Sequence, residues 1–331
     1  MKPDGTLLLT SRDVAALLTI EECIAAVENA FKLYGEGKTE PPGILGVHAR
    51  DGGFHIKAGL LDLSRSYFAA KINANFPENA KRFGLPTIQG VVVVCDGENG
   101  YPLALMDSIE ITIHRTGAAT GVAAKYLARP DSKTVTICGC GNQGHISLRA
   151  LTKVLPIEKA WVWDRDQAQA QRFADELVAD LNIDIEVVAD LQTAVGQSDV
   201  VVTCTPSKHP FLKKDFVAPG TFIAAVGSDN PEKQELEPVL LSGNKLVADV
   251  LEQCATIGEL HHALDEGLMT RESAYGELGE VVAGVKPRRT SPDEIIIFDS
   301  TGMALQDVVA AAAVYEKAVS EQVGTVIDFA Q

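Results

Sequence analysis

The stretch that decides the fold is Thr134-Val-Thr-Ile-Cys-Gly-Cys-Gly-Asn-Gln-Gly-His145. Its first five residues predict a short buried strand, and residues 145–155 carry apolar side chains at helical spacing. Between them, Gly139, Gly141 and Gly144 form a G-x-G-x-x-G pattern. Glycines in this place permit a tight turn and close approach to a pyrophosphate, and the following helix offers free N–H groups. The segment therefore predicts a dinucleotide site, which includes Asn142 and Gln143 of the same loop.

A second predicted strand, 159–163, ends at Asp164, and 164 − 144 gives the spacing of 20 at which an acid meets the adenosine ribose. A carboxylate repels the 2′-phosphate of NADP, so Asp164 favours NAD. Arg165, directly after it, weakens this preference. The alternative for the whole segment is a glycine-rich turn that binds nothing.

Strands and helical segments alternate from Thr134 onward, which indicates an α/β domain with a doubly wound parallel sheet. The expected strands are 134–138, 159–163, 184–188, 199–203, 221–226, 245–248 and 294–298. Upstream, strands at 46–50, 54–60, 67–76, 87–95 and 101–106 follow one another, with a turn at 51–53, and indicate a smaller, strand-rich α+β domain. The helix predicted over 304–323 is expected to fold back on it. We therefore expect one domain of residues 1–120 plus 304–331 and a Rossmann domain of residues 121–303.

Composition excludes several classes of function. The chain has 331 residues and a net charge of −16, which argues against nucleic acid or an anionic membrane surface as partner. No apolar run approaches the roughly 18 residues that span a bilayer. The first residues lack the order of a signal peptide. The six cysteines are scattered and form no metal-type pair, so we expect no metal, buried thiols and a cytoplasmic location.

A purely structural role does not readily explain two cationic side chains, Lys71 and Arg115. Lys71 lies in a predicted strand and shares one face with Asn73 and Asn75, because side chains alternate along a strand. That face is either a solvated outer surface or part of a pocket. Arg115 interrupts an otherwise apolar helix. It is either an exposed helix residue or a carboxylate clamp, for which the guanidinium fork is suited.

A second group of candidates lies at predicted turns. His48, Arg50, His55 and Lys57 flank the turn at 51–53, and they form either a surface hairpin or a positively charged pocket wall. Asp229 follows the predicted strand 221–226. Ligands of open α/β sheets bind at the carboxyl ends of strands, although an aspartate in a turn is usually a turn former.

Together these motifs resemble the ornithine cyclodeaminase/mu-crystallin superfamily, which also includes archaeal-type alanine dehydrogenases and ketimine reductases. The resemblance covers nearly the whole chain. It rests on Lys71-Ile-Asn-Ala-Asn-Phe-Pro77, Gly84-Leu-Pro-Thr-Ile-Gln-Gly90, Pro102-Leu-Ala-Leu-Met-Asp107, Arg115-Thr116, Cys138-Gly-Cys-Gly-Asn-Gln-Gly144, Gly227-Ser-Asp-Asn-Pro231 with Glu235-Leu236, and Ser300-Thr-Gly302 with Asp307.

The resemblance implies an NAD-dependent oxidoreductase that moves a hydride between the nicotinamide and the α-carbon of an amino or imino acid. It implies that Lys71 and Arg115 bind the substrate carboxylate and that Asp229 is the acid/base, with Lys71 as a further catalytic candidate. It also implies a homodimer formed by the N-terminal domain. Besides Asp164, the resemblance implies further cofactor contacts at Thr116, the loop Gly139–Gly144, Thr205, Val226 and Ser300.

Departures from the family pattern carry the information on the substrate. Pro41-Pro42-Gly43 lacks an arginine that many members have, and Lys57-Ala58-Gly59 stands where many read Met-Pro-Ala. Arg50 or Lys57 would replace the missing cation, with His48 and Asn75 as further substrate contacts.

Ornithine cyclodeaminase needs an acidic group for the distal ammonium of its substrate, whereas the predicted wall here is basic. A substrate with a second carboxylate is therefore favoured, and reduction of iminosuccinate to aspartate is the most concrete candidate. Three alternatives stay open: ornithine cyclodeamination, an alanine dehydrogenase or cyclic ketimine reductase, and a non-catalytic NAD- and ligand-binding protein of the mu-crystallin type.

Overall fold

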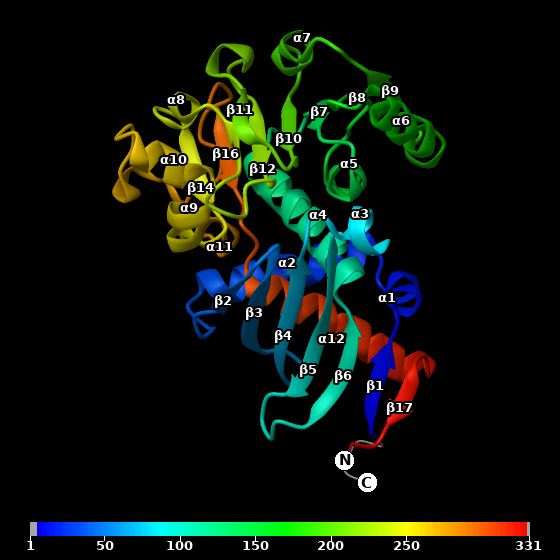
Figure 1. Ribbon diagram of the computed structural model, residues 1–331. Coiled ribbons are helices and arrows are strands. Elements are labelled where there is room, and N and C mark those ends of the chain that lie inside the picture. Colours follow the sequence, from blue (N-terminus) through cyan, green and yellow to red (C-terminus); the bar gives the residue numbers. More distant parts are fainter. Residues whose placement is uncertain (1–4, 330–331) are drawn as a thin grey trace. The chain divides into compact units, whose positions relative to one another are not determined.

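The computed structural model describes residues 5–329, and the chain divides into two compact units (Figure 1). The strand-rich unit comprises Met1–Arg115 and Met303–Gln331. The parallel-sheet unit comprises Thr116–Gly302. Helix α4 (Ser108–Leu127) begins in the first unit and ends in the second.

The strand-rich unit is built on a seven-stranded sheet with the order β17-β1-β6-β5-β4-β3-β2. Its neighbours are antiparallel except for the parallel pair β1–β6. The strands are β1 (Thr6–Leu9), β2 (Gly43–Ala49), β3 (Gly52–Asp62), β4 (Ser66–Asn75), β5 (Ile88–Asp96), β6 (Pro102–Asp107) and β17 (Thr325–Ile327). The helices are α1 (Ser11–Leu17), α2 (Ile20–Gly35), α3 (Asn79–Phe83) and α12 (Ala304–Glu321).

The predicted turn at 51–53 is wrong, because Gly52 and Gly53 already belong to β3. They pair with Ala49 and His48 of β2, which leaves only residues 50 and 51 to turn the chain. A Cβ atom at Gly52 would lie 2.4 Å from the carbonyl oxygen of Asn75. The glycine is therefore needed for the close approach of β4, and it does not mark a loop.

One face of this sheet is covered by α12, which packs against β3, β4 and α2. The helix sits so close at Gly59 that a Cβ there would lie 2.8 Å from Leu305 Cδ2. Further along, Tyr67 donates a hydrogen bond of 2.8 Å to Glu316. The last helix thus completes the core under strands that the chain forms some 240 residues earlier.

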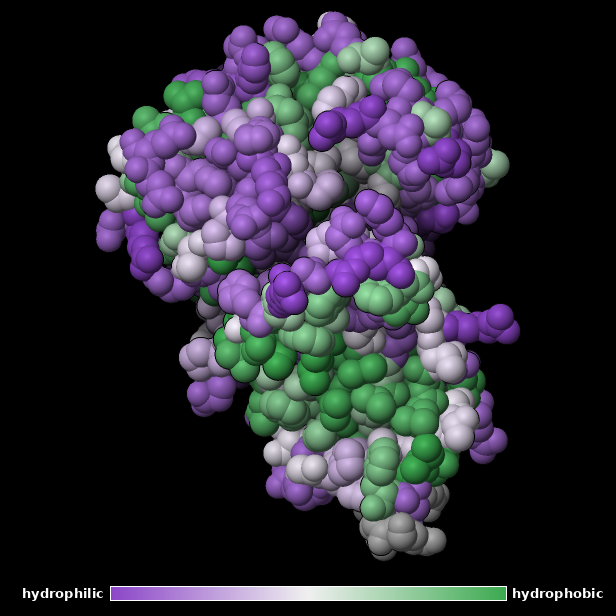
Figure 2. Space-filling view, in the orientation of Figure 1, coloured by the Kyte–Doolittle hydropathy of each residue, from purple (hydrophilic) through white to green (hydrophobic). Residues whose placement is uncertain are grey.

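The opposite face of the sheet carries large exposed apolar side chains. Leu45 is 56% exposed, Ile72 37% and Val91 38%, and the strand register places Val47 and Phe54 on the same side. Figure 2 shows this apolar area over β2–β6. We call these five residues the open sheet face.

The parallel-sheet unit contains an eight-stranded sheet with the order β15-β14-β16-β12-β10-β7-β8-β9, and its strand pairs are parallel. The strands are β7 (Thr134–Cys138), β8 (Lys159–Trp163), β9 (Asp184–Val187), β10 (Val200–Thr203), β12 (Phe222–Ala225), β14 (Lys245–Ala248), β15 (Gly276–Glu277) and β16 (Ile296–Asp299). The order reverses between β7 and β10, which is where ligands bind in doubly wound sheets. The predicted combination of a doubly wound parallel sheet with a smaller α+β part is confirmed.

Helices connect these strands, and a small parallel ribbon of β11 (Lys208–Leu212) and β13 (Gln234–Leu236) adjoins them. The helices are α5 (Asn142–Val154), α6 (Gln167–Leu181), α7 (Leu191–Gly196), α8 (Pro238–Leu241), α9 (Leu251–Ile257), α10 (Glu259–Asp265) and α11 (Leu278–Val282). No helix within residues 5–329 is long and apolar enough to cross a membrane. The six cysteines are free thiols, four of them buried.

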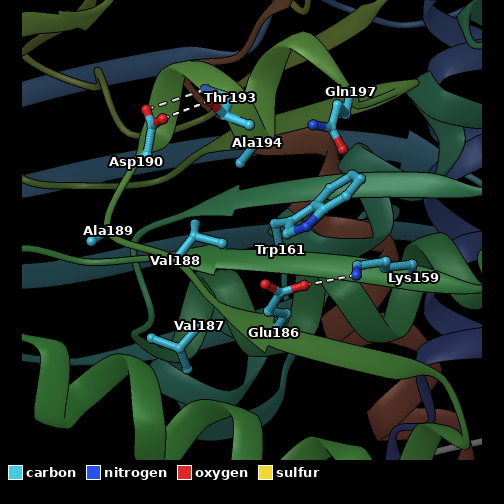
Figure 3. Close-up of a pocket in the computed structure, with 10 residues that line it drawn as sticks. All are labelled: Lys159, Trp161, Glu186, Val187, Val188, Ala189, Asp190, Thr193, Ala194 and Gln197. Carbon is cyan, nitrogen blue, oxygen red and sulfur yellow. Dashed lines mark hydrogen bonds and ion pairs between the residues drawn. The ribbon is translucent and has the colours of Figure 1, made fainter.

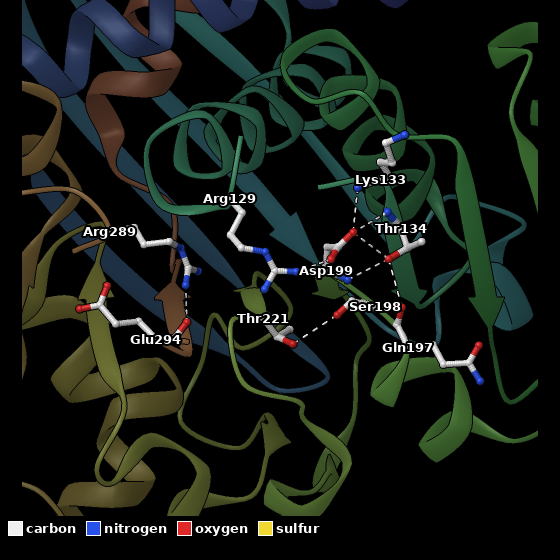
Figure 4. Close-up of polar contacts among 9 residues, drawn as sticks. All are labelled: Arg129, Lys133, Thr134, Gln197, Ser198, Asp199, Thr221, Arg289 and Glu294. Carbon is white, nitrogen blue, oxygen red and sulfur yellow. Dashed lines mark hydrogen bonds and ion pairs between the residues drawn. The ribbon is translucent and has the colours of Figure 1, made fainter. Parts of the chain in front are cut away.

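Asp199, directly before β10, fastens the amino edge of this sheet (Figure 4). Its carboxylate accepts hydrogen bonds from the backbone N–H groups of Lys133 (2.8 Å) and Thr134 (3.0 Å) and from the Thr134 hydroxyl. It also pairs with Arg129. One carboxylate therefore joins the starts of two neighbouring strands.

Candidate active site

Three cations surround one carboxylate inside the strand-rich unit. Lys71 Nζ of β4 lies 2.8 Å from Asp307 Oδ1, in the first turn of α12. Arg115 Nε of α4 lies 3.2 Å from the same oxygen. Lys57 of β3 stands directly opposite Lys71 in the antiparallel register, so both side chains project from the same face. We call Lys57, Lys71, Arg115 and Asp307 the cation cluster.

Burial makes these charges unusual. Lys71 is 3% exposed, Arg115 7% and Asp307 2%. Burial lowers the pKa of Lys71 to about 7, against the attraction of Asp307 and with the repulsion of Arg115 and Lys57. Burial would raise the pKa of Asp307, but the two neighbouring cations outweigh it and hold that pKa below its usual value. Two basic side chains and one carboxylate are thus buried together, an arrangement that favours the binding of an anion.

Several polar atoms around the cluster are buried without a hydrogen-bond partner. Arg115 donates to Gln306 Oε1 at 3.0 Å, while Gln306 Nε2 has no partner. The same holds for Asp307 Oδ2, Asn73 Oδ1 and Asn75 Oδ1. Leaving such an atom unsatisfied costs about 1–3 kcal/mol. These four atoms belong to the start of α12 or to the strand face of Lys71, and they indicate a place built for a polar ligand.

Only three of the four residues of the predicted positively charged pocket wall lie on one face of the sheet. His55 pairs with Asn73 and His48 with Gly53, so both histidines share the face of Lys57 and Lys71. Arg50 does not lie on a strand. It lies in the turn after β2 and lines a separate hollow, which also includes Phe76, Asn79 and Arg82 and no member of the cation cluster.

The glycine loop of the parallel-sheet unit has the geometry expected of a pyrophosphate site. Gly139 has φ +107°, and a Cβ there would lie 2.9 Å from the carbonyl oxygen of Cys204. A Cβ at Gly144 would lie 2.2 Å from the carbonyl oxygen of Gly139. Gly141 caps α5 without a side-chain hydrogen bond, and nothing lies within 4 Å of its Cβ position. No side chain therefore covers the N-cap of α5 at this point, and the first N–H groups of the helix, which lack partners within it, fit the phosphates of a dinucleotide.

Asp164 stands at the carboxyl end of β8, beside this loop. Its Oδ2 accepts a hydrogen bond from the Cys140 amide at 2.8 Å, and its Oδ1 accepts one from the Asp166 amide at 2.9 Å. The carboxylate thus fixes the start of the glycine loop. Arg165 is exposed next to it.

The other expected cofactor contacts lie at the carboxyl ends of neighbouring strands. Thr205 follows β10, Val226 follows β12 and Ser300 follows β16, and these three strands are adjacent and parallel. Asp229 lies in the turn after β12, where it pairs with Lys233 at 2.7 Å. Thr116, the first residue of the parallel-sheet unit, is buried within α4.

Sequence reasoning assigned no role to Asp307 or to Glu235, which is fully buried in β13. Both stand in the motifs that carry the family resemblance, and this was the signal available. Asp307 pairs with Lys71 and Arg115, and Glu235 accepts hydrogen bonds from Thr205 and Gly227. Of these partners only Gly227 is close along the chain, eight positions away, so a local pattern does not reveal the others.

A shallow hollow between α7 and strands β8 and β9 has polar walls (Figure 3). Lys159 pairs with Glu186 at 2.7 Å, and Asp190 caps α7 through Thr193. Each of these charged groups already has a partner in the wall, and we assign the hollow no ligand.

The ornithine cyclodeaminase/mu-crystallin family model matches residues 5–322. The chain belongs to this family. An archaeal alanine dehydrogenase dimer with bound NAD is similar, at 40% identity and a TM-score of 0.93, covering 98% of this chain and 99% of that one. The Δ1-pyrroline-2-carboxylate reductase of Thermococcus litoralis, in complex with NADH and L-proline, has 36% identity, a TM-score of 0.89 and coverage of 97% and 100%.

A third member of the family is the iminosuccinate reductase of Paracoccus denitrificans in complex with NAD⁺. It has 32% identity and a TM-score of 0.91, and the match covers 98% of this chain and 100% of that one. These findings confirm the predicted family, the oxidoreductase class and the NAD cofactor. The relatives differ in substrate.

The depressed pKa of Lys71 predicts a pH dependence of stability. Between about pH 7 and the ordinary lysine pKa, the unfolded chain binds a proton at Lys71 that the folded chain does not. The free energy of unfolding therefore rises with pH over this window relative to a Lys71→Met variant. Urea unfolding at several pH values from about 7 to 10 measures the difference between the two proteins.

Lys133→Met is the matched control, because Lys133 is a surface lysine whose ion pair with Glu158 raises its pKa. Its contribution is constant below the ordinary lysine pKa. A difference between the wild type and Lys71→Met that stays flat across the window contradicts the account of Lys71.

Proposed function

We propose that the protein is an NAD-dependent imino acid reductase whose substrate is an imino dicarboxylate, with iminosuccinate reduced to aspartate as the most concrete candidate. The observation that carries this proposal is the cation cluster. Lys71 and Arg115 both pair with the carboxylate of Asp307, and Lys57 stands opposite Lys71 on the neighbouring strand. A substrate with two carboxylates would give these basic side chains two anionic partners.

The charge of the cluster separates the alternatives. An ornithine cyclodeaminase requires an acid for the distal ammonium of its substrate, and Asp307 is already engaged by Lys71 and Arg115. A monocarboxylate would engage Lys71 and Arg115, whereas Lys57 beside them favours a second carboxylate. Alanine dehydrogenase activity nevertheless stays a second candidate, because the archaeal relative at 40% identity is an alanine dehydrogenase.

Each proposed substrate contact has a distinct task. Arg115, held by Gln306 and Asp307, would bind the α-carboxylate together with Lys71, because the guanidinium fork matches the two oxygens of a carboxylate. Lys57 would receive the second carboxylate, with His48 and Asn75 as outer contacts. Binding an anion would also favour the charged form of Lys71.

Asp229 is the proposed acid/base. The nitrogen of an imine must be protonated before its carbon accepts a hydride, and a carboxylic acid beside that nitrogen can supply the proton. Bound NADH would supply the hydride. Loss of Asp229 would therefore slow the chemical step more than it weakens substrate binding.

The parallel-sheet unit would hold the cofactor. We assign the pyrophosphate to the loop Gly139–Gly144, with Asn142, Gln143 and Thr116, and the adenosine ribose to Asp164, with Arg165 beside it. Thr205, Val226 and Ser300 would contact the rest of the dinucleotide from the carboxyl ends of β10, β12 and β16. The strand-rich unit would bind the substrate. A cytoplasmic location stays a prediction.

We also propose that two copies associate through the open sheet face. Apolar side chains gathered on one surface commonly mark a protein–protein interface, and a long uncovered sheet face is otherwise an aggregation hazard. The archaeal alanine dehydrogenase relative is a dimer. A face shared by two copies would be self-complementary, as a twofold axis requires.

Turnover of NADH with oxaloacetate plus ammonia tests the enzyme proposal, because this mixture forms iminosuccinate in solution. We expect oxidation above the uncatalysed rate and faster than with pyruvate plus ammonia. The Asp229→Asn variant should lose about 100- to 10,000-fold in kcat, the usual contribution of a general acid. Asp215→Asn, an exposed aspartate of the same unit, should not change it.

No turnover by the wild type with oxaloacetate and ammonia would sink the substrate proposal, and an Asp229→Asn variant at the wild-type rate would sink the assigned acid/base. Proline formed from ornithine with catalytic NAD would instead establish cyclodeamination.

Ile72→Glu tests the dimer, because it places a charge in the middle of the open sheet face. Light scattering after size-exclusion chromatography should give the mass of a dimer for the wild type and of a monomer for the variant. Val178→Glu is the control, an exposed apolar residue of α6 in the other unit. A wild type that runs as a monomer, or an Ile72→Glu variant that stays dimeric, contradicts the proposed interface.

A further inference from the structure

Glu235 of β13 joins two loops at the carboxyl edge of the parallel sheet. Its Oε1 accepts hydrogen bonds from the Thr205 amide (2.5 Å) and the Thr205 hydroxyl (2.7 Å). Its Oε2 accepts one from the Gly227 amide at 3.0 Å. Thr205 follows β10 and Gly227 follows β12, so one carboxylate fastens the ends of two neighbouring strands.

The turn that carries Asp229 rests directly on this carboxylate. A Cβ atom at Gly227 would lie 2.4 Å from Glu235 Oε2, which is closer than real side chains permit. Gly227 stands two residues before Asp229 in the segment Gly227-Ser-Asp229. The backbone two residues before Asp229 is therefore packed and hydrogen-bonded on Glu235.

Glu235 is itself held by a second buried carboxylate. Glu259, at the start of α10, accepts hydrogen bonds from the amides of Glu235 (2.8 Å) and Leu236 (3.2 Å). Asp299 in turn accepts bonds from the amides of Glu259 (3.1 Å) and Leu260 (2.9 Å). Burying several carboxylates in one region is costly, and their hydrogen bonds to backbone amides offset that cost. These hydrogen bonds therefore restrain the loops after β10 and β12 in addition to side-chain packing.

We propose that Glu235 is a positioning residue for the reaction, which acts by holding the Gly227-Ser-Asp229 turn at a fixed place beside Thr205. This inference rests on the proposed acid/base role of Asp229. Glu235 acts through that turn, and we assign it no contact with substrate.

The Glu235→Gln variant removes one of the two acceptor oxygens while keeping the size of the side chain. Its amide NH₂ would face either the Thr205 or the Gly227 N–H group, and two donors cannot pair. The turn would move away from its present position. A displacement of about 1 Å at a reacting group costs on the order of 100-fold in rate.

A double-mutant cycle in kcat with oxaloacetate plus ammonia tests the inference, at saturating NADH because Glu235 also holds the proposed cofactor contact Thr205. We expect Glu235→Gln to lower kcat by about 10- to 100-fold, with KM for the keto acid unchanged because Lys71 and Arg115 are untouched. Because Glu235 acts through Asp229, the Glu235→Gln/Asp229→Asn double variant should be no slower than Asp229→Asn alone, within about twofold.

Gly227→Ala is a second variant that keeps the charge. Its new methyl group would meet the Glu235 carboxylate and displace the same turn. It should reproduce the loss in kcat, and its measurement keeps the test decisive if Glu235→Gln fails to fold.

Asp199→Asn is the matched control, because Asp199 also bridges two segments through backbone amides and a hydroxyl, but at the amino edge of the sheet (Figure 4). It should lower the free energy of unfolding and leave kcat per folded molecule unchanged. A Glu235→Gln variant with the wild-type kcat, or effects that multiply in the double variant, would overturn the inference while Asp229→Asn stays slow. A fast Asp229→Asn variant would overturn the proposed function instead, and this inference with it.

Discussion

The ion pairs of Asp307 with Lys71 and Arg115 are the interaction on which the strand-rich unit depends. They join α12 to β4 and α4 inside a region where unpaired charge is costly. Removing one partner of such a buried pair typically costs about 3–5 kcal/mol, because the other charge is left uncompensated. The start of α12 is therefore fixed by charge as well as by its packing on β3 and β4. The same contacts orient the two cations that we assign to the substrate.

Buried carboxylates also stabilise the parallel-sheet unit, at the carboxyl ends of its strands. Buried carboxylates, Glu235 and Glu259 among them, accept hydrogen bonds from backbone amides and so hold loops in place. Burial raises the pKa of Glu235, and its hydrogen bonds from Thr205 and Gly227 oppose that rise. Loops that carry reacting groups must be rigid to about an ångström, and the hydrogen bonds to these buried carboxylates provide such rigidity.

Sequence patterns predicted the parts of the fold whose residues lie close together along the chain. The strand β7, the glycine loop and the acid at 164 follow one another along the chain, and both the pattern and its chemistry lie within about 30 residues. Strands β1 and β17 escaped prediction because each is short and is defined by its partners, and their sheet neighbours lie far along the sequence. The residues that hold the site escaped for the same reason. Lys71 and Asp307 are 236 positions apart.

The register of the hairpin favours one of two candidates that the sequence left open. Arg50 and Lys57 were both candidates to replace the missing cation. With Gly52 and Gly53 inside β3, Arg50 falls in the turn and Lys57 falls opposite Lys71. A one-residue change of register would have reversed the face of Lys57.

The preference between two substrates in a Lys57→Met variant tests the central claim most directly. The measurement is the ratio of kcat/KM for oxaloacetate plus ammonia to that for pyruvate plus ammonia. We predict that the wild type favours the dicarboxylate and that Lys57→Met loses about 10- to 100-fold on it, as for a charged hydrogen bond worth about 1.5–3 kcal/mol, with pyruvate unaffected. Arg50→Met should leave the ratio unchanged. A wild type that favours pyruvate, or a Lys57→Met variant that loses both substrates equally, would contradict the account.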